Sequence, residues 1–485
     1  EYPLLARGGR LEADPRTYRD GVRRGARQVL AQAGGRRVVA LTFTTQGETL
    51  IPVDAHGRAL GPAIVWLDDR AAAEAADLRR AIEPTAFYAT TGLPTLDGTV
   101  PLAKARHLLG TLPELTGQGA RLLFVEDYLL RWLTGRTVSH RSLQTSSGWF
   151  DLHADDYWDA ALALAGISRR LLPELVGCGE PIGRVLPEAA RELGLQPDVL
   201  VVAGAMDQAA AALGAGVDPS GRIGVSFGTA LVATAATTAP VTDPGCLPTT
   251  YRHALDGGFL VLLIEPTGGA LLRWLRDLLV PYPDTGSPGY ADLDDLAGAL
   301  PPGSEGVLAL PFFQGGCSDR NTAPGGFLGL TLGSGRGHLA RSLMEAASYA
   351  LRDLLGSLAG LGMPATELIT SGGGSRSPLW QSIAADVCGV PLTPLPSGEA
   401  ASAGAALLAG WGSGLVRPGT DPRPRDRAVA VLPDPLRPYE PHYAAYRRTV
   451  DALVRHRADG PVRDYPAPAT GPAPQPTSPT GRRTR

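Results

Sequence analysis

"GRIGVSFGTALVATAA", residues 221–236, decides between two folds for this chain. It contains Gly224-Val225-Ser226-Phe227-Gly228, which fits the G-x-S-x-G template of a serine-hydrolase nucleophile elbow. The same residues also describe a short hairpin turned at glycine, whose backbone amides can hold a phosphate. The first interpretation predicts a serine hydrolase with Ser226 as nucleophile, and the second predicts a nucleotide-binding protein.

The residues around this motif favour the hairpin. A nucleophile elbow needs a buried strand that enters the serine and a helix that leaves it. Here the turn-forming "DPSG" (218–221) leaves only "RIGV" as a strand before Ser226, and "TALVAT" (229–234) suits a returning strand at least as well as a helix. No histidine further along stands in surroundings that mark a member of a catalytic triad. A purely structural hairpin remains the open alternative.

Length and composition indicate a soluble protein of two domains. The chain has 485 residues, of which 44% are hydrophobic and 19% charged. No apolar run approaches the roughly 18 residues of a membrane span, and the net charge of -3 gives no global attraction to nucleic acid. Four widely spaced cysteines suggest reduced thiols, and the histidines form no zinc-binding pattern. We expect a cytoplasmic enzyme with no metal ligands of its own, and a homodimer is possible.

Strands and helices alternate along almost the whole sequence, which predicts an α/β fold of two lobes. The "DPSG" turn is the expected boundary, giving lobes of residues 1–217 and 218–457. Residues 458–485 are rich in proline with few apolar residues, and we expect a disordered tail. The single lysine, Lys104, lies in "TVPLAKARH", which is no Walker-type phosphate loop.

Asp207 is the first candidate for chemistry. In "VVAGAMDQAAAALGAG" (201–216) a strand ends at Gly-Ala, and Asp-Gln opens a helix of small residues. An Asp at that position can simply cap the helix. However, ligands in open α/β sheets bind beyond the carboxyl ends of strands, and the helix start favours the ionised carboxylate. Asp207 could then accept a proton from a substrate hydroxyl.

A second candidate is the glycine-rich turn in "LITSGGGSRSPLW" (368–380). Ser377 is the expected N-cap of the following helix, with Pro378 at its first position. One glycine would suffice for a turn, and three in succession, residues 372–374, suggest that a flat group lies against bare backbone. Taken alone, this is weak evidence for a ligand site.

In order along the chain, these segments resemble the FGGY family of carbohydrate kinases, in the actin/hexokinase-like superfamily. "GGFLGLTLGSGRGHLARSLME" (325–345) fits that family's C-terminal signature at each constrained position. "GGGSRSPLWQSIAADVCGVPL" (372–392) and "EAASAGAALLAG" (399–410) are similar to its adenosine loop and last core helix. "IVWLDDRA" (64–71) resembles the W-x-D-x-R stretch of its N-terminal lobe. The likeness covers almost the whole chain except the tail.

This resemblance implies two RNase-H-like lobes around a cleft, with ATP bound mainly by the second and sugar mainly by the first. It implies ATP-dependent phosphorylation of a small sugar or polyol, with an alcohol group as acceptor, Asp207 as general base and Mg²⁺ accompanying ATP. Ser226 then belongs to a phosphate hairpin. The residues expected at ATP are Gly228, Thr229, Gly269, Gly373 and Gly374.

The acceptor is less clearly indicated. "TTQGETLIPVD" (44–54) aligns with the segment that contacts the acceptor in glycerol and xylulose kinases. Glu48 resembles the glycerol enzymes, Gly47 matches neither group, and the stretch "TGLPTL" (91–96) is closer to the sugar kinases. The mixture implies a ketopentose such as xylulose or a glycerol-like polyol. The candidate acceptor-binding residues, each of which could instead be structural, are Gln46, Glu48, Trp66 and Gln208.

One departure from the family concerns the start of the chain. Family members begin with a strand hairpin carrying D-x-G-T, whereas "EYPLLARGGRLEADPRTYRD" (1–20) resembles the segment that comes after this hairpin in the family. We expect an N-terminally truncated sequence of a working kinase. The alternatives are a catalytically impaired sugar-binding relative and, further away, the Ser226 hydrolase.

Overall fold

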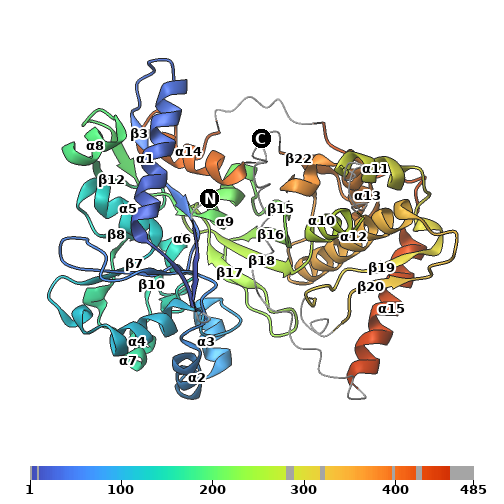
Figure 1. Ribbon diagram of the computed structural model, residues 1–485, viewed down its shortest axis with the longest axis horizontal. Helices are drawn as coiled ribbons and strands as arrows, with labels where there is room; N and C mark the ends of the chain where they lie inside the picture. Colours follow the sequence, from blue (N-terminus) through green and yellow to red (C-terminus); the bar gives the residue numbers. More distant parts are fainter. Residues whose placement is uncertain are drawn as a thin grey trace, which may run out of the picture.

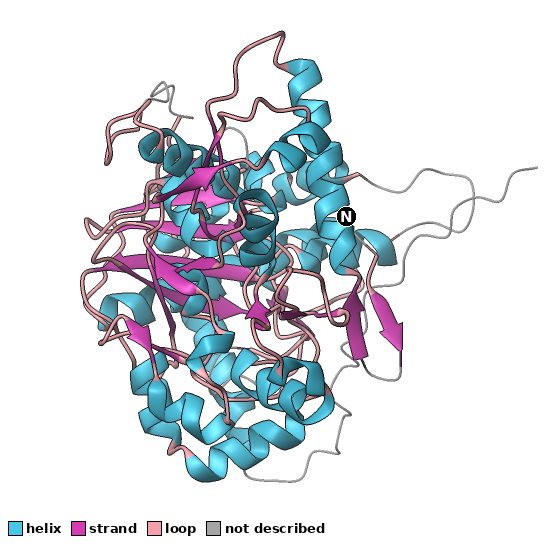
Figure 2. Ribbon diagram, turned by 90° about the vertical axis from the view of Figure 1, so that its left-hand side faces the viewer, coloured by secondary structure: helices cyan, strands magenta, loops and turns pink. Residues whose placement is uncertain are grey.

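The computed structural model describes residues 3–7, 10–279, 289–316, 323–395, 399–421 and 429–458. Two lobes lie side by side, one built mainly from the first half of the chain and one mainly from the second (Figure 1). Strands run through the middle of the molecule with helices on either side of them (Figure 2). The predicted two-lobed α/β architecture is thus confirmed. The expected disordered tail falls, apart from Ala458, outside the described residues.

The first lobe contains short strands in several small sheets. They are β1 (Leu5–Arg7), β2 (Arg10–Ala13), β3 (Ala40–Leu41), β4 (Thr44–Thr45), β5 (Ile51–Val53), β6 (Ala63–Ile64), β7 (Arg121–Leu123), β8 (Val138–His140), β9 (Phe150–Asp151), β10 (Asp156–Tyr157), β11 (Glu174–Val176), β12 (Pro181–Arg184), β13 (Leu200–Val202) and β14 (Ala205–Met206). The helices are α1 (Pro15–Gln32), α2 (Ala72–Ala81), α3 (Pro84–Thr91), α4 (Pro101–Thr111), α5 (Val125–Thr134), α6 (Arg141–Gln144), α7 (Asp159–Ala165), α8 (Pro187–Leu193) and α9 (Asp207–Ala215).

Two parallel strand pairs form the part of this lobe that carries the candidate site. β13 pairs with β3, and β14 pairs with β4 in the register Ala205↔Thr44 and Met206↔Thr45. Because paired parallel strands end at the same edge of a sheet, the segments that follow β4 and β14 emerge together.

The second lobe is organised around one six-stranded sheet in the order β17-β18-β16-β15-β21-β22. Its strands are β15 (Arg222–Phe227), β16 (Leu231–Thr237), β17 (Thr249–Arg252), β18 (Phe259–Glu265), β21 (Glu367–Ser371) and β22 (Leu392–Pro394), beside the separate pair β19 (Leu308–Leu310) and β20 (Gly326–Leu328). The helices are α10 (Ala270–Leu278), α11 (Tyr290–Gly298), α12 (Arg336–Gly360), α13 (Pro378–Cys388) and α15 (Glu440–Ala458). Helix α14 (Ala400–Gly412) comes from the same half of the chain but packs on the first lobe.

The segment 221–236 forms the predicted hairpin. β15 and β16 pair antiparallel from Gly224↔Thr234 to Phe227↔Leu231, so the chain returns as a strand after Gly228. No helix follows Ser226, and the strand–turn–helix that a nucleophile elbow requires is not formed there. The hydrolase interpretation of Ser226 was therefore wrong.

The starts of α13 and α9 illustrate how far local sequence rules hold. The Ser377 hydroxyl accepts a hydrogen bond from the Trp380 amide at 3.0 Å, and Pro378 opens α13 as predicted. At α9, by contrast, Met206 occupies the N-cap position and Asp207 is the first helical residue. Asp207 thus does not cap the helix, and another reason must account for a carboxylate there.

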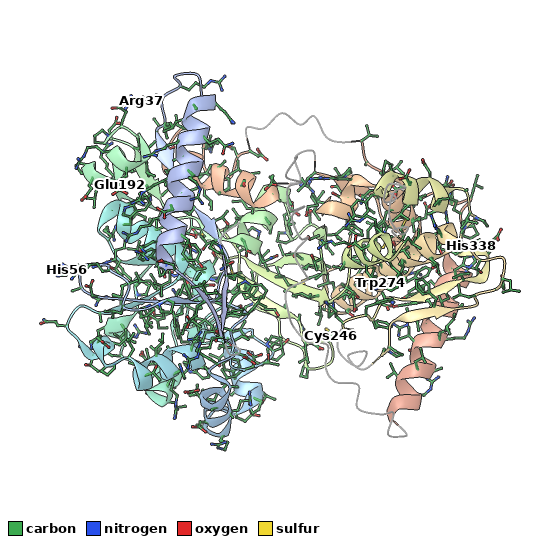
Figure 3. All side chains as sticks on the ribbon, in the orientation of Figure 1. Arg37, His56, Glu192, Cys246, Trp274 and His338 are labelled. Atoms are coloured by element: carbon green, nitrogen blue, oxygen red, sulfur yellow. The ribbon has the colours of Figure 1, made fainter. Side chains whose placement is uncertain are left out.

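The two halves of the chain contact each other at several places in the described ranges. Helix α14 packs against α9 and the short strands of the first lobe, and Figure 1 shows it, in orange, beside α9. In the loop before β17, the Tyr88 hydroxyl donates to the Pro248 carbonyl at 2.7 Å and accepts from the Asp243 amide at 3.1 Å. Cys246, in the same loop, lies between the lobes in Figure 3. Among the described residues we find no helix with the length and apolarity to span a membrane.

Candidate active site between the lobes

The acceptor half of the site is built where β4 and β14 end. Gln46 directly follows β4 and Asp207 directly follows β14, so the register Met206↔Thr45 brings the two segments out side by side. Two predicted site segments separated by about 160 residues in the sequence therefore meet at one edge of the sheet.

The environment of Asp207 suits a general base. Its Oδ1 accepts a hydrogen bond from the Gln208 amide at 2.7 Å. Burial raises the pKa of the Asp207 carboxyl, and that hydrogen bond opposes the rise only in part. The expectation that the helix start would favour the ionised form is corrected here, because desolvation outweighs stabilisation of the charge. A carboxylate with a raised pKa is a stronger base toward a substrate hydroxyl.

Glu48 is held in an uncommon backbone conformation. Its φ is +67°, in the left-handed region that residues other than glycine seldom adopt. Buried Thr49 fixes the turn, since its hydroxyl oxygen accepts hydrogen bonds from the Gln46 side-chain amide at 2.8 Å and the Trp66 amide at 3.2 Å. Strained backbone of this kind persists where the surrounding structure enforces it, which is common in ligand sites.

Glu48 lies close enough to Asp207 for the two charges to interact. Burial raises the pKa of the Glu48 carboxyl to about 7, and the negative charges of Asp97 and Asp207 add to the rise, while Lys104 opposes it. The same two carboxylates, Glu48 and Asp207, also raise the pKa of Tyr251, after burial as the main cause. Tyr251 is on β17, in the part of the chain that forms the second lobe.

The remaining acceptor candidates lie on either side of this cluster. Trp66 is 42% exposed, which is high for a tryptophan in a fixed loop and leaves ring surface for a ligand. Gln46 is partly committed to structure through Thr49. Gly47 has no room for a side chain, because a Cβ there would lie 2.4 Å from the Ser146 Oγ. The contact with Ser146 therefore accounts for glycine at position 47.

Gln208 connects the acceptor half to the hairpin of the second lobe. It lines a cavity of about 40 Å³ between α9 and the six-stranded sheet, together with Ser226 of β15 and Ser371 of β21. The lining is mostly apolar, and Gln208, Ser226, Thr234 and Ser371 supply its polar part. Gln208, the residue after Asp207, thus lies beside β15, the first strand of the predicted phosphate hairpin.

The nucleotide half consists of three glycine-containing turns in contact with one another. The Gly269 amide donates to the Gly228 carbonyl at 2.6 Å, and the Gly268 amide donates to the Thr229 carbonyl at 2.8 Å. A Cβ on Gly269 would lie 2.8 Å from the Gly228 carbonyl oxygen. The start of α10 is therefore attached directly to the hairpin turn.

The third turn, at residues 372–374, contacts the same hairpin. Gly372 has φ +84°, and a Cβ on it would lie 2.8 Å from the carbonyl carbon of Phe227. A Cβ on Gly374 would meet Phe227 and the Trp380 ring, both at 2.8 Å, whereas a Cβ on Gly373 would have no atom within 4 Å. Packing accounts for Gly372 and Gly374, and of these three glycines only Gly373 faces open space.

In the described part of the chain, the candidate site residues do not form a metal site by themselves. Within the described ranges, no three His, Cys, Asp or Glu side chains are grouped so that they could hold a metal ion. Mg²⁺ in phosphoryl-transfer enzymes commonly keeps several waters and binds through one or two carboxylates together with the substrate phosphates.

Residues 4–214 match the N-terminal domain of the FGGY family of carbohydrate kinases, and residues 223–413 match its C-terminal domain. The chain belongs to the FGGY family. It is 30% identical to the xylulose kinase of Escherichia coli K12 over 91% of each chain. It is 33% identical to the glycerol kinase of Aromatoleum aromaticum, over 80% of this chain and 79% of that one. The crystal structure of xylulose kinase from Rhodospirillum rubrum superposes with a TM-score of 0.82 at 29% identity, over 94% of this chain and 93% of that one.

These matches confirm the predicted family, its two-lobed actin/hexokinase-like fold and its activity. An FGGY kinase phosphorylates a sugar or polyol at the expense of ATP, which agrees with a phosphate-binding role for the opening hairpin, and that role stays a prediction. The roles of individual residues remain predictions.

Sequence reasoning did not single out three residues near Glu48, namely Lys104, which bonds its carbonyl, and Asp97 and Tyr251, which interact with it electrostatically. Asp97 and Tyr251 lie in unremarkable loop and strand sequence, where nothing signals a site. Lys104 does carry a signal, because it is the only lysine of the chain and stands at an apolar helix position.

Proposed function

We propose that this FGGY kinase phosphorylates a hydroxyl group of a ketopentose such as xylulose, or of a glycerol-like polyol, with Mg²⁺ accompanying ATP. The observation that carries the proposal is the position of Asp207. It emerges beside Gln46 and Glu48 at one sheet edge, and its neighbour Gln208 lines the same cavity as Ser226 of the phosphate hairpin.

Each half of the site has a distinct task in this proposal. Gln46, Glu48, Trp66 and Gln208 orient the acceptor, with Trp66 offering ring surface to its carbon chain. Gly228, Thr229, Gly269 and Gly373 receive ATP, while Gly374 supports them by packing. Mg²⁺ supplies charge neutralisation on the phosphate oxygens when it is bound.

The reaction then follows from the placement of Asp207. Its ionised carboxylate takes the proton of the acceptor hydroxyl as that oxygen bonds to the γ-phosphorus of ATP. The bond between the γ-phosphorus and the bridging oxygen breaks, ADP leaves, and Asp207 passes the proton to solvent. In a loose transition state the nucleophile bonds late, so positioning and charge stabilisation supply most of the acceleration.

The proposal is tested by following ADP release from ATP and Mg²⁺ with a panel of polyols and ketoses that includes glycerol and D-xylulose. Asp207→Asn should lower kcat by about 10²–10⁴, the usual effect of removing a general base, with little change in the affinity for ATP. Asp20→Asn, on the exposed side of α1, is the matched control and should leave kcat unchanged. Full activity of Asp207→Asn would refute the assigned role.

A further inference from the structure

Lys104 is a fully buried cation with no obvious duty in the reaction. It is the only lysine of the 485 residues, and its side chain in α4 has 0% exposure. Burying an ammonium group is strongly unfavourable unless hydrogen bonds and opposite charges compensate for lost hydration. A buried lysine that the fold tolerates therefore needs an explanation in its contacts.

Those contacts lie entirely within the acceptor-binding segments. The Nζ atom donates to the carbonyl oxygens of Glu48 at 3.2 Å, Val65 at 3.0 Å and Trp66 at 3.2 Å. An ammonium group has three donors, and here each has a backbone acceptor. One side chain thus joins the segment after β4 to the loop after β6.

The surrounding charges keep this ammonium protonated at neutral pH. Burial lowers the pKa of Lys104 to about 8, and the carboxylates of Glu48, Asp68 and Asp97 limit the decrease, while Arg70 adds to it. Arg70 is itself paired with Asp68 at 2.7 Å and with Glu12 at 2.8 Å. Lys104 is consequently the cation that balances Glu48, and its hydrogen bonds go to backbone and not to a ligand.

The backbone at Glu48 shows what the contact accomplishes. The residue whose carbonyl Lys104 holds is also the one with φ +67°, a conformation that is unfavourable for a residue other than glycine. Without the ammonium, this carbonyl would lose its buried donor and the turn would be free to relax. The direction of the Glu48 side chain depends on that turn.

We propose that Lys104 is a positioning residue for the acceptor, fixing Glu48 and Trp66 relative to each other through the backbone carbonyls of residues 48, 65 and 66. The inference rests on the proposed function, because it assigns these two residues to the acceptor. It predicts that Lys104 governs acceptor binding without touching ATP.

The test compares Lys104→Met with Arg106→Met, the same change of cation to methionine two residues along α4, where Arg106 bonds the Leu164 carbonyl at the surface. Methionine keeps much of the length and apolar contact of lysine but has no donor and no charge. With glycerol and D-xylulose as probes, Lys104→Met should raise the acceptor KM about tenfold or more. The KM for ATP should stay within about twofold, and Arg106→Met should change neither.

A second measurement uses the wild-type protein and does not depend on the variant folding. Because the chain has one lysine, lysine labelled with ¹³C and ¹⁵N gives a single side-chain signal in NMR spectra. That signal should titrate near pH 8 and shift when glycerol or D-xylulose binds, but not when ATP alone binds. A signal that titrates near 10.5 and ignores the acceptor would overturn the inference.

The two proposals fail in different ways. A wild-type chain that binds these polyols but releases no ADP would refute the proposed function alone, and the shift of the lysine signal would still decide the role of Lys104. If the wild type turns over but Lys104→Met changes the KM values for acceptor and ATP equally, or changes neither, Lys104 is merely structural. A wild type that binds no acceptor leaves nothing for Lys104 to position and overturns both.

Discussion

Gly214 of α9 and Gly404 of α14 meet backbone to backbone where the two helices cross. A Cβ on Gly214 would lie 1.9 Å from the Ala400 carbonyl oxygen, and a Cβ on Gly404 would lie 1.9 Å from the Ala210 carbonyl oxygen. Neither helix can therefore carry a side chain at the crossing. Since α9 begins at Asp207, this contact helps to fix the position of Asp207, the proposed general base.

Gly404→Ala should destabilise the protein and lower its activity. The added methyl must force the helices apart, and overpacking of this kind costs about 1–3 kcal/mol. We expect a lower midpoint of thermal unfolding and a reduced kcat. Gly356→Ala is the control, because Gly356 is an exposed position of α12 with no atom within 4 Å of an added Cβ. It should leave kcat unchanged and raise stability by up to about 1 kcal/mol; equal effects of the two variants would contradict the crossing argument.

Glu48→Gln should weaken acceptor binding and stabilise the protein, with a stabilisation that depends on pH. The folded-state pKa of Glu48 lies near 7, above its ordinary value of 4.5, so its protonated form is the one the fold favours. Below pH 4.5 this group does not lower the free energy of unfolding, because it is protonated in both states. As the pH rises from 4.5 through 7, the unfolded chain loses this proton more readily than the folded protein, and the free energy of unfolding falls. Glutamine mimics the protonated form and avoids that decrease. Thermal unfolding at pH 5 and pH 8 should show the variant gaining stability over wild type toward pH 8, while its acceptor KM is higher. A stability difference that does not change with pH would contradict the raised pKa.

Gly373→Ala should separate nucleotide binding from folding. A methyl group at this position meets no protein atom within 4 Å, so the unfolding midpoint should be unchanged. If the adenosine part of ATP lies over this glycine, the KM for ATP should rise about tenfold, with the acceptor KM unaltered. Gly374→Ala is the contrasting variant, because its methyl would clash with Phe227 and Trp380 and should lower stability first. An unchanged KM for ATP in Gly373→Ala would place the nucleotide elsewhere.

The sequence was sufficient to predict the family and the order of the main helices and strands. The hairpin at 221–236, the Ser377 cap and the strand-to-helix step at Asp207 follow from local rules of turn and cap chemistry, which act over a few residues. Local patterning also placed the glycines at 372–374 in a turn, and the family resemblance pointed to Gly269. Neither could show that these turns touch the hairpin, because those contacts depend on the pairing of β16 with β18 and of β15 with β21.

The features that the sequence could not show depend on burial and long-range contacts. The raised pKa of Asp207 comes from desolvation, which is a property of the packed lobes, and the sequence suggested the opposite direction. The three acceptors of Lys104 lie 38 to 56 residues away along the chain, so no local pattern reveals them. The distinction between Gly373 and Gly374 likewise appears only when Phe227 and Trp380 are in place.

A neutral acceptor should be strongly preferred over one that carries a carboxylate. The acceptor half presents the carboxyl groups of Glu48, Asp97 and Asp207, and the two cations beside them are already engaged. Lys104 donates to three backbone carbonyls and Arg70 to Asp68 and Glu12. A carboxylate placed there would meet like charges in a partly desolvated site where both of these cations are already engaged, which is unfavourable.

D-glucitol and D-gluconate test this preference directly, because they share a carbon chain and differ at C1, where one has an alcohol and the other a carboxylate. We expect kcat/KM to favour glucitol by about tenfold or more, since one unpaired buried charge corresponds to at least about 1.4 kcal/mol. Asp97→Asn removes one repelling charge and should narrow that ratio, chiefly through the KM for gluconate. Asp20→Asn should leave the ratio as it is. If gluconate proves the better acceptor, the three carboxyl groups do not face the substrate, and the acceptor half must be redrawn around a different set of side chains.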